Sequence, residues 1–207
     1  MITSYHAITR RAEVKPHETV FLFGLGGLGF NALQIVLHIG ARVIVSDVRQ
    51  ERLDEAVWIG VPPEDVVPLN SSIRDFVQEK GLLIDTTLDF VGKHQTFQDA
   101  QNIRKCPRQT VGRTFTDHPV VRRGGKMLCV GTLDGENTID MKIGIRKRLT
   151  ILFTYGAQRR DLEEVLDLIA SGVIKPQVEN APFRDFPRLL KELCDGRIKA
   201  RVALLYD

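Results

Sequence analysis

Cysteine is scarce in this chain of 207 residues, which has only Cys106, Cys129 and Cys194. The three are far apart and none belongs to a Cys-x-x-Cys pair, which argues against a disulfide framework and against a cysteine zinc ribbon. Unpaired thiols are typical of proteins in a reducing compartment. We therefore expect a cytoplasmic location.

Long apolar runs and a strong charge of one sign are also lacking. No apolar stretch approaches the roughly 18 residues of a membrane-spanning helix, and residues 1–14 lack the continuous apolar segment of a signal peptide. The net charge is only +3, with basic residues in short clusters, so neither nucleic acid nor a membrane surface is an expected partner. The 43% of hydrophobic residues suffices for one sizeable core.

Short apolar segments with strand composition alternate with segments of helical periodicity. The predicted strands are residues 19–24, 41–47, 65–69, 83–92, 125–132 and 149–156, and the predicted helices are residues 27–41, 49–60, 72–80, 96–105 and 160–172. This alternation predicts an α/β fold, a doubly wound parallel sheet of the Rossmann type with helices on both faces.

Two segments depart from the alternation. Residues 104–119 interrupt the pattern before the strand that ends in "KMLCVG", and from Ile174 onward two strand-like pieces flank one helix. We therefore predict a dinucleotide-binding domain over residues 1–173, with an atypical insertion at 104–119, and a separate C-terminal segment over residues 174–207.

The motif most informative about function is "FLFGLGGLGF", which contains Gly24-x-Gly26-x-x-Gly29. A strand precedes it and a helix follows, as in the glycine turns that bind the diphosphate of a dinucleotide. Gly24 permits the tight turn, Gly26 leaves room for the diphosphate, and Gly29 permits close packing of helix and strand. The alternative is a turn that serves packing only.

Asp47 lies at the end of the next predicted strand. A carboxylate there accepts hydrogen bonds from the adenosine ribose hydroxyls and repels a 2′-phosphate, which favours NAD over NADP. Arg49 is close enough in sequence to weaken this preference without reversing it. The alternative role for Asp47 is that of an ordinary helix cap.

Several further motifs occur in the order found in zinc-type medium-chain alcohol dehydrogenases, and the chain resembles the C-terminal portion of such an enzyme. The motifs are "TSYHAI", "VFLFGLGGLGFNALQI", "ARVIVSD", "DFVG" followed by "TFQDA", "VRRGGKMLCVGTLDG", "DLEEVLDLIASGVIKPQVE" and "GRIKARVALL". Only residues 104–119 have no counterpart in the resemblance.

The resemblance implies a set of NAD-binding residues. Gly24, Gly26, Gly27, Leu28 and Gly29 would form the diphosphate turn and Asp47 would hold the ribose. The adenosine side would be lined by Phe90, Val91 and Gly92, and the nicotinamide side by Thr3, Val130, Gly131, Thr132, Phe153 and Thr154, with Arg201 near the diphosphate. For the apolar members, simple core packing is the alternative.

Zinc is the family's catalytic metal, but the resemblance places its ligands in an N-terminal domain and just before the "TSYHA" helix, outside this sequence. No residue here is therefore predicted as catalytic or as a metal ligand. His6 is expected on a helix surface, and Cys129 is expected to be a buried, inert thiol.

The resemblance also implies that residues 174–207 complete the GroES-like catalytic domain. In its absence "ARVALLY" would be an unpaired edge strand, and poor solubility is expected. The strand at 149–156 would form a dimer edge.

For residues 104–119 two interpretations remain open. One is a surface loop, because long insertions cost little entropy. The other is a retained intron, because codons for Arg104-Lys105 and for residues 116–120 can contain splice signals.

For function, the first hypothesis is the NAD-binding portion of an alcohol dehydrogenase, impaired alone. The alternative is a non-catalytic nucleotide-binding or dimerisation module, a homodimer or a partner of a full-length relative. A zinc-independent quinone-reductase-like activity with NADPH is disfavoured by Asp47.

Overall fold

A computed structural model describes residues 1–102, 104–105, 118–119, 121–198 and 201–206. Its centre is a five-stranded sheet of order β2-β1-β3-β6-β7, in which every neighbouring pair is parallel. The strands are β1 (Thr19–Phe23), β2 (Arg42–Ser46), β3 (Ile84–Asp89), β6 (Val121–Cys129) and β7 (Thr150–Phe153). The predicted α/β fold with a Rossmann-type parallel sheet is confirmed.

Strand β1 shows why this sheet is covered on both faces. Its last four residues are fully buried, and alternate side chains enter two different hydrophobic clusters. Val20 and Leu22 pack with residues of the first helix after the glycine turn, whereas Phe21 and Phe23 pack with Phe76 from the opposite layer. A strand buried on both faces needs an unbroken apolar sequence, which "VFLF" provides.

The helices lie close to their predicted positions, except that the helix predicted over residues 96–105 ends at Asn102 and residues Arg104–Lys105 form a short strand instead. They are α1 (Ile2–His6), the π-helix η1 that continues it (Ala7–Ala12), α2 (Gly29–Ile39), α3 (Gln50–Trp58), α4 (Ile73–Glu79), α5 (His94–Asn102) and α7 (Arg159–Ala170). Gly40 ends α2 in a left-handed conformation with φ of 83°. Ser72 is the cap that begins α4, because its hydroxyl accepts the Asp75 N–H at 3.2 Å.

The predicted strand at 65–69 is wrong in extent. Residues Pro63–Asp65 form a 3-10 turn (η2), and only Val66 forms a parallel bridge, to Val45 of β2. Pro68 has no N–H to donate, so the ladder cannot continue through it. Helix α6 (Met141–Lys147) was not predicted, because Gly144 interrupts its short apolar pattern.

Strand β6 begins four residues earlier than predicted, and its register with β3 shifts between Ile84 and Thr86. Two short strands, β4 (Arg104–Lys105) and β5 (His118–Pro119), pair antiparallel at the two ends of the predicted insertion. The remainder of residues 104–119, including Cys106, lies outside the described residues.

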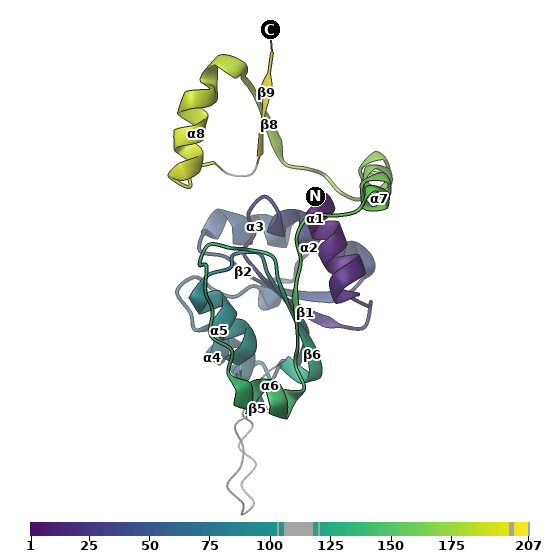
Figure 1. Cartoon of the computed structure of the whole chain (residues 1–207), viewed down its shortest axis with the longest axis vertical. Coiled ribbons are helices and arrows are strands. Elements are labelled where there is room, and N and C mark those ends of the chain that lie inside the picture. Colours follow the sequence, from purple (N-terminus) through teal and green to yellow (C-terminus); the bar gives the residue numbers. More distant parts are fainter. Residues whose placement is uncertain (103, 106–117, 120, 199–200, 207) are drawn as a thin grey trace, which may run out of the picture.

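The C-terminal unit comprises β8 (Val178–Pro182), the 3-10 turn η3 (Phe183–Asp185), α8 (Phe186–Cys194) and β9 (Arg201–Leu205). Figure 1 shows it at one end of the molecule, beyond the sheet and its helices. The expectation of an unpaired "ARVALLY" strand is wrong, because β9 pairs with β8 in parallel. No described residue of these four elements is buried, however, so the unit has no core of its own.

Side chains of α2 and α3 hold the segment between α7 and this unit to the body. Gln34 of α2 accepts the Lys175 N–H at 2.8 Å, and buried Arg52 of α3 donates to the Gln177 side chain at 2.6 Å. Among the helices of the described ranges, none combines the length and the apolarity needed to cross a bilayer.

Candidate functional site

The glycine turn contains two positions at which a side chain would be strained or would overlap the backbone, and one that faces open space. Gly24 has a φ of 83°, a conformation that favours glycine. A Cβ on Gly29 would lie 1.8 Å from the Gly24 carbonyl oxygen, so only glycine permits this approach of α2 to the end of β1. A Cβ on Gly26 would meet no atom within 4 Å, which leaves open space above the turn.

The turn presents donors to that open space. In the part of the chain that the structure describes, the N–H groups of residues 26–29 donate to no protein acceptor, whereas the carbonyls of this segment are engaged. Gly27 accepts from the Asn31 side chain at 2.6 Å, and Leu28 accepts from the Ser4 hydroxyl at 2.8 Å. Free N–H groups at the start of an 11-residue helix are suited to an anion.

Asp47 follows β2 and turns its carboxylate toward the glycine turn. It accepts the Leu25 N–H at 2.6 Å and the Arg49 N–H at 3.0 Å, and the Arg49 Nε lies 3.6 Å away. The carboxylate can still accept further hydrogen bonds, since its two oxygens have about four lone-pair sites. Arg49 therefore weakens but does not remove the negative charge at the strand end.

A cleft of about 540 Å³ begins at Gly24 and Asp47, although residues 25–29 of the glycine turn do not line it. Gly24, Asp47 and Val91 line it, at the carboxyl ends of β1, β2 and β3. Residues 67–71 follow the bridge between Val66 and Val45, and they form another wall of the cleft. Ligands of open α/β sheets bind in this position.

The turns after β3 and β6 lie in direct backbone contact. A Cβ on Gly92 would lie 2.1 Å from the Gly131 carbonyl carbon, and a Cβ on Gly131 would lie 2.2 Å from the Val91 carbonyl carbon. Phe90 and Val130 pack against the hydrophobic core beside these turns, as the core-packing alternative expected. The end of β7 is adjacent, since the Thr154 N–H donates to the Cys129 carbonyl at 3.3 Å and Phe153 pairs with Cys129.

Of the predicted site residues, only Gly24, Asp47 and Val91 line the cleft. Arg201 is exposed on β9 in the C-terminal unit and does not line the cleft. Thr3 is on α1, next to Ser4, and it too does not line the cleft. Thr132 follows Gly131 in the turn after β6 and is exposed.

Sequence reasoning missed three side chains that build this site. Ser4 is fully buried and fixes the Leu28 carbonyl. Asp89 is buried at the end of β3, and Thr96 of α5 lines the cleft. The sequence does give a signal for Asp89, because it is an acid at the end of a strand, as Asp47 is. Ser4 and Thr96 cannot be distinguished by sequence from ordinary helix residues.

No protein-family model matches the chain. Among curated proteins it is 26% identical over 208 residues to an alcohol dehydrogenase of Geobacillus stearothermophilus, covering 100% of this chain and 56% of that protein. It is 29% identical over 208 residues to alcohol dehydrogenase 1 of Emericella nidulans, covering 98% and 54%. The chain is homologous to the alcohol dehydrogenases. The predicted resemblance to their zinc-type family is confirmed, and the chain spans about half the length of these relatives.

Solved structures show the same fold. Acetophenone reductase from Geotrichum candidum in complex with NAD matches with a TM-score of 0.78 and 28% identity, covering 98% of this chain and 52% of that one. The alcohol dehydrogenase from Aeropyrum pernix matches with a TM-score of 0.81 and 24% identity, covering 99% and 55%. The first of these relatives holds NAD.

Helices α1 and η1 of this alcohol dehydrogenase homologue are fixed to α7 by a polar network. Asp161 is fully buried; it lies 2.8 Å from His6 Nδ1 and accepts from Arg10 Nε at 3.1 Å and from the Gln158 N–H at 2.8 Å. Glu164 accepts from the Tyr5 hydroxyl at 2.5 Å, and burial together with this carboxylate raises the pKa of Tyr5 to about 12. His6 therefore takes part in a structural contact rather than lying free on a helix surface.

Cys129 has the environment of an unreactive thiol. Burial, followed by the negative charge of Asp89, raises its pKa to about 12. At pH 8 only about one thiol in ten thousand is then ionised, and the thiolate is the form that reacts.

We expect iodoacetamide at pH 8 to alkylate exposed Cys194 in the native protein and to leave Cys129 unmodified. Mass spectrometry of proteolytic fragments measures both sites in one sample, and the same treatment in denaturant should modify both. Alkylation of the two cysteines at equal native rates would contradict the raised pKa of the half-buried Cys129 thiol.

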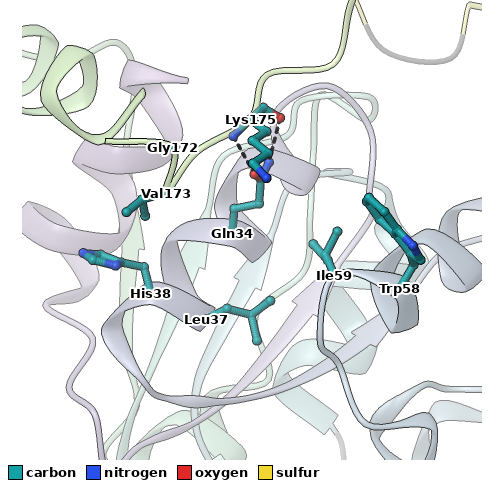
Figure 2. A pocket seen from close by; sticks show the side chains of 8 residues that line it. All are labelled: Gln34, Leu37, His38, Trp58, Ile59, Gly172, Val173 and Lys175. Atoms are coloured by element: carbon teal, nitrogen blue, oxygen red, sulfur yellow. Dashed lines mark hydrogen bonds between the residues drawn. The ribbon is translucent and has the colours of Figure 1, made fainter. Parts of the chain in front are cut away.

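A second hollow lies on the outer side of α2 and α3, with a volume of about 370 Å³. Figure 2 shows the Gln34 side chain bonded to Lys175, with Ile59 and Trp58 on one side and His38 and Val173 on the other. None of the predicted cofactor-binding residues lines it. It is therefore separate from the cleft at the strand ends.

Within the described ranges, no three His, Cys, Asp or Glu side chains are grouped so that they could hold a metal ion. The donor set that zinc requires is thus not assembled from these residues.

Proposed function

We propose that this chain binds NAD(H) as the cofactor-binding portion of an alcohol dehydrogenase. The observation that carries the proposal is the joint geometry of the glycine turn and Asp47, whose carboxylate lies 2.6 Å from the Leu25 amide nitrogen. The turn offers N–H groups for the diphosphate, and the carboxylate next to it can accept from the ribose hydroxyls. The bound cofactor would supply the hydride acceptor for alcohol oxidation.

The remaining roles follow from position. Val91 and Gly92 would line the adenosine side, with Phe90 behind them. Val130, Gly131, Thr132, Phe153 and Thr154 would face the nicotinamide, with Thr3 nearby. Arg201 would reach the diphosphate only if the C-terminal unit is placed differently, since β9 does not border the cleft. We assign residues 1–173 to the dinucleotide-binding domain and 174–207 to a segment of the catalytic domain, in a cytoplasmic protein.

Asp47→Ser is expected to weaken NAD binding about 30-fold, because hydrogen bonds to a charged group contribute roughly 1.5–3 kcal/mol. NADP binding should change less, since the substitution also removes repulsion of the 2′-phosphate. Calorimetric titration of both dinucleotides measures the ratio.

Asp54→Ser is the matched control, because Asp54 is exposed on α3 and accepts a hydrogen bond from the Gln50 side chain at 2.8 Å. It should leave both affinities unchanged. An unaltered NAD-to-NADP ratio in Asp47→Ser would contradict the proposed role of Asp47, and no affinity of the folded wild type for either dinucleotide at millimolar concentration would refute NAD binding.

A second candidate function is that of a non-catalytic partner, either in a homodimer or with a full-length relative. It is favoured by α8, whose Phe186, Leu190 and Leu193 are 45–58% exposed, and by the outer edge of β7, the last strand of the sheet. Alcohol turnover by the purified chain with NAD and added zinc distinguishes the two candidates.

A further inference from the structure

Asp89 connects to more main-chain groups around the cleft than any predicted site residue does. Its Oδ1 accepts the N–H groups of Val91 and Gly92, both at 2.9 Å, and its Oδ2 accepts the Thr96 hydroxyl at 2.9 Å. Its side chain thereby fixes the turn that follows β3. The residue is 1% exposed, so no water competes for these bonds.

The main chain of Asp89 fixes the second turn. Its carbonyl oxygen accepts the N–H groups of Val130 at 2.9 Å and Gly131 at 3.0 Å, immediately after β6. One residue at the end of β3 thus orients two turns that belong to different strands.

The two turns are also tied to each other. The Gly92 carbonyl accepts the Asp134 N–H at 2.8 Å, and a Cβ on either Gly92 or Gly131 would overlap the opposite backbone. A displacement of the turn after β3 must therefore displace the turn after β6. There is no side chain between them that could absorb the movement.

We propose that Asp89 is a positioning residue that sets the separation of the adenosine-side and nicotinamide-side turns of the cofactor site. This inference rests on the proposed NAD binding. Removing the carboxylate leaves the half-buried Val91 N–H and the buried Gly92 N–H without an acceptor, and a turn whose donors are unsatisfied rearranges to reach water. The cofactor must bridge both turns, so a change in their separation affects NAD more than a ligand that contacts only one of them.

The test compares Asp89→Ala with Asp89→Asn, using NAD and 5′-AMP as ligands in calorimetric titrations. Asp89→Ala is expected to weaken NAD about 30-fold and AMP about 3-fold, because AMP occupies only the adenosine side. Asp89→Asn keeps an oxygen for the Val91 and Gly92 N–H groups and should bind NAD within about 5-fold of the wild type. Rescue by asparagine separates hydrogen bonding from charge.

Amide hydrogen exchange provides a measurement that does not depend on the cofactor. In Asp89→Ala the N–H groups of Val91, Gly92 and Gly131 should lose protection, while those of β1 keep it. If Asp89→Ala does not fold, Gly131→Ala replaces it, since its Cβ forces the same turns apart, and it should show the same larger loss for NAD than for AMP.

Equal weakening of NAD and AMP, or unchanged protection of these N–H groups in a folded Asp89→Ala, would overturn the inference. The remaining outcome is that Asp89→Ala loses protection at these N–H groups while the wild type binds no NAD. That result would refute the proposed function and leave the structural role of Asp89 in place.

Discussion

Gly29→Ala is expected to bring NAD binding below detection at millimolar cofactor and to lower the free energy of unfolding by about 3 kcal/mol. The new Cβ would lie 1.8 Å from the Gly24 carbonyl oxygen and 2.9 Å from its carbon, both backbone atoms that no rotamer change can move away. Helix α2 must then shift from the end of β1. The shift disorganises the free N–H groups of residues 26–29, which we propose bind the diphosphate.

Gly26→Ala is the matched variant in the same turn. Its Cβ meets no atom within 4 Å, so the free energy of unfolding should stay unchanged or rise by up to about 1 kcal/mol. NAD affinity should still fall, by about 30-fold, because the methyl group enters the space that we propose the diphosphate occupies. Chemical denaturation and calorimetric titration give both quantities.

Gly144→Ala in α6 is the control outside the turn, since its Cβ also meets no atom within 4 Å and it does not border the cleft. It should leave NAD affinity at the wild-type value. If Gly26→Ala behaved like Gly144→Ala, with intact affinity, the diphosphate would not lie against this turn.

Asp161→Asn is expected to lower the free energy of unfolding by about 3 kcal/mol, because the buried side chain loses its charge-assisted hydrogen bonds with His6 and Arg10, although Arg10 keeps its ion pair with Glu164. Asp161 is fully buried, and it joins His6 and Arg10 to the start of α7. For a domain of this length the thermal midpoint should fall by roughly 6–12 °C.

Glu163→Gln on the same helix is the matched control. Glu163 pairs with Arg159 at 3.3 Å, but the two side chains are 64% and 92% exposed, so the change should cost no more than about 0.5 kcal/mol. Similar losses in both variants would show that the burial of Asp161 has no energetic importance.

The difference between wild type and Asp161→Asn should depend on pH. Burial acts to raise the pKa of Asp161, but hydrogen bonds from the Gln158 N–H, His6 and Arg10 outweigh it and hold the pKa below 3.8. A carboxylate with a depressed pKa stabilises the folded state fully above its unfolded pKa, near 4, and the stabilisation is lost as the pH falls through the folded value. Denaturation at pH 7 and at pH 3 measures this loss.

Much of the fold was predictable because the strands are buried on both faces. A stretch such as "VFLF" has no polar position, and only a central parallel strand between two layers suits it. The strand predicted at residues 65–69 was mispredicted. Its apolar residues correctly indicate burial, but Pro68 prevents the hydrogen-bond ladder from continuing. Helix α6 was missed because its cap, Asp140, and its Gly144 resemble a loop in sequence.

The candidate site was predictable where backbone geometry requires one residue type. Gly24 and Gly29 were found because the sterics of a tight turn and a close helix exclude every side chain. Ser4 and Thr96 could not be found, since their roles depend on which carbonyl or carboxylate lies opposite, and that is set by contacts distant in sequence. Arg201 lies outside the cleft. Its position could not be predicted, because tertiary contacts determine where the C-terminal unit lies.

The contact between the turns after β3 and β6 restricts how this sequence can change. In many packed pairs, enlarging one side chain is offset by shrinking its neighbour. Positions 92 and 131 allow no such exchange, because each missing Cβ would overlap the main chain of the opposite turn rather than a side chain. Second-site suppressors of a substitution at either glycine should therefore arise only by moving a whole strand end, never by a reciprocal change at the other position.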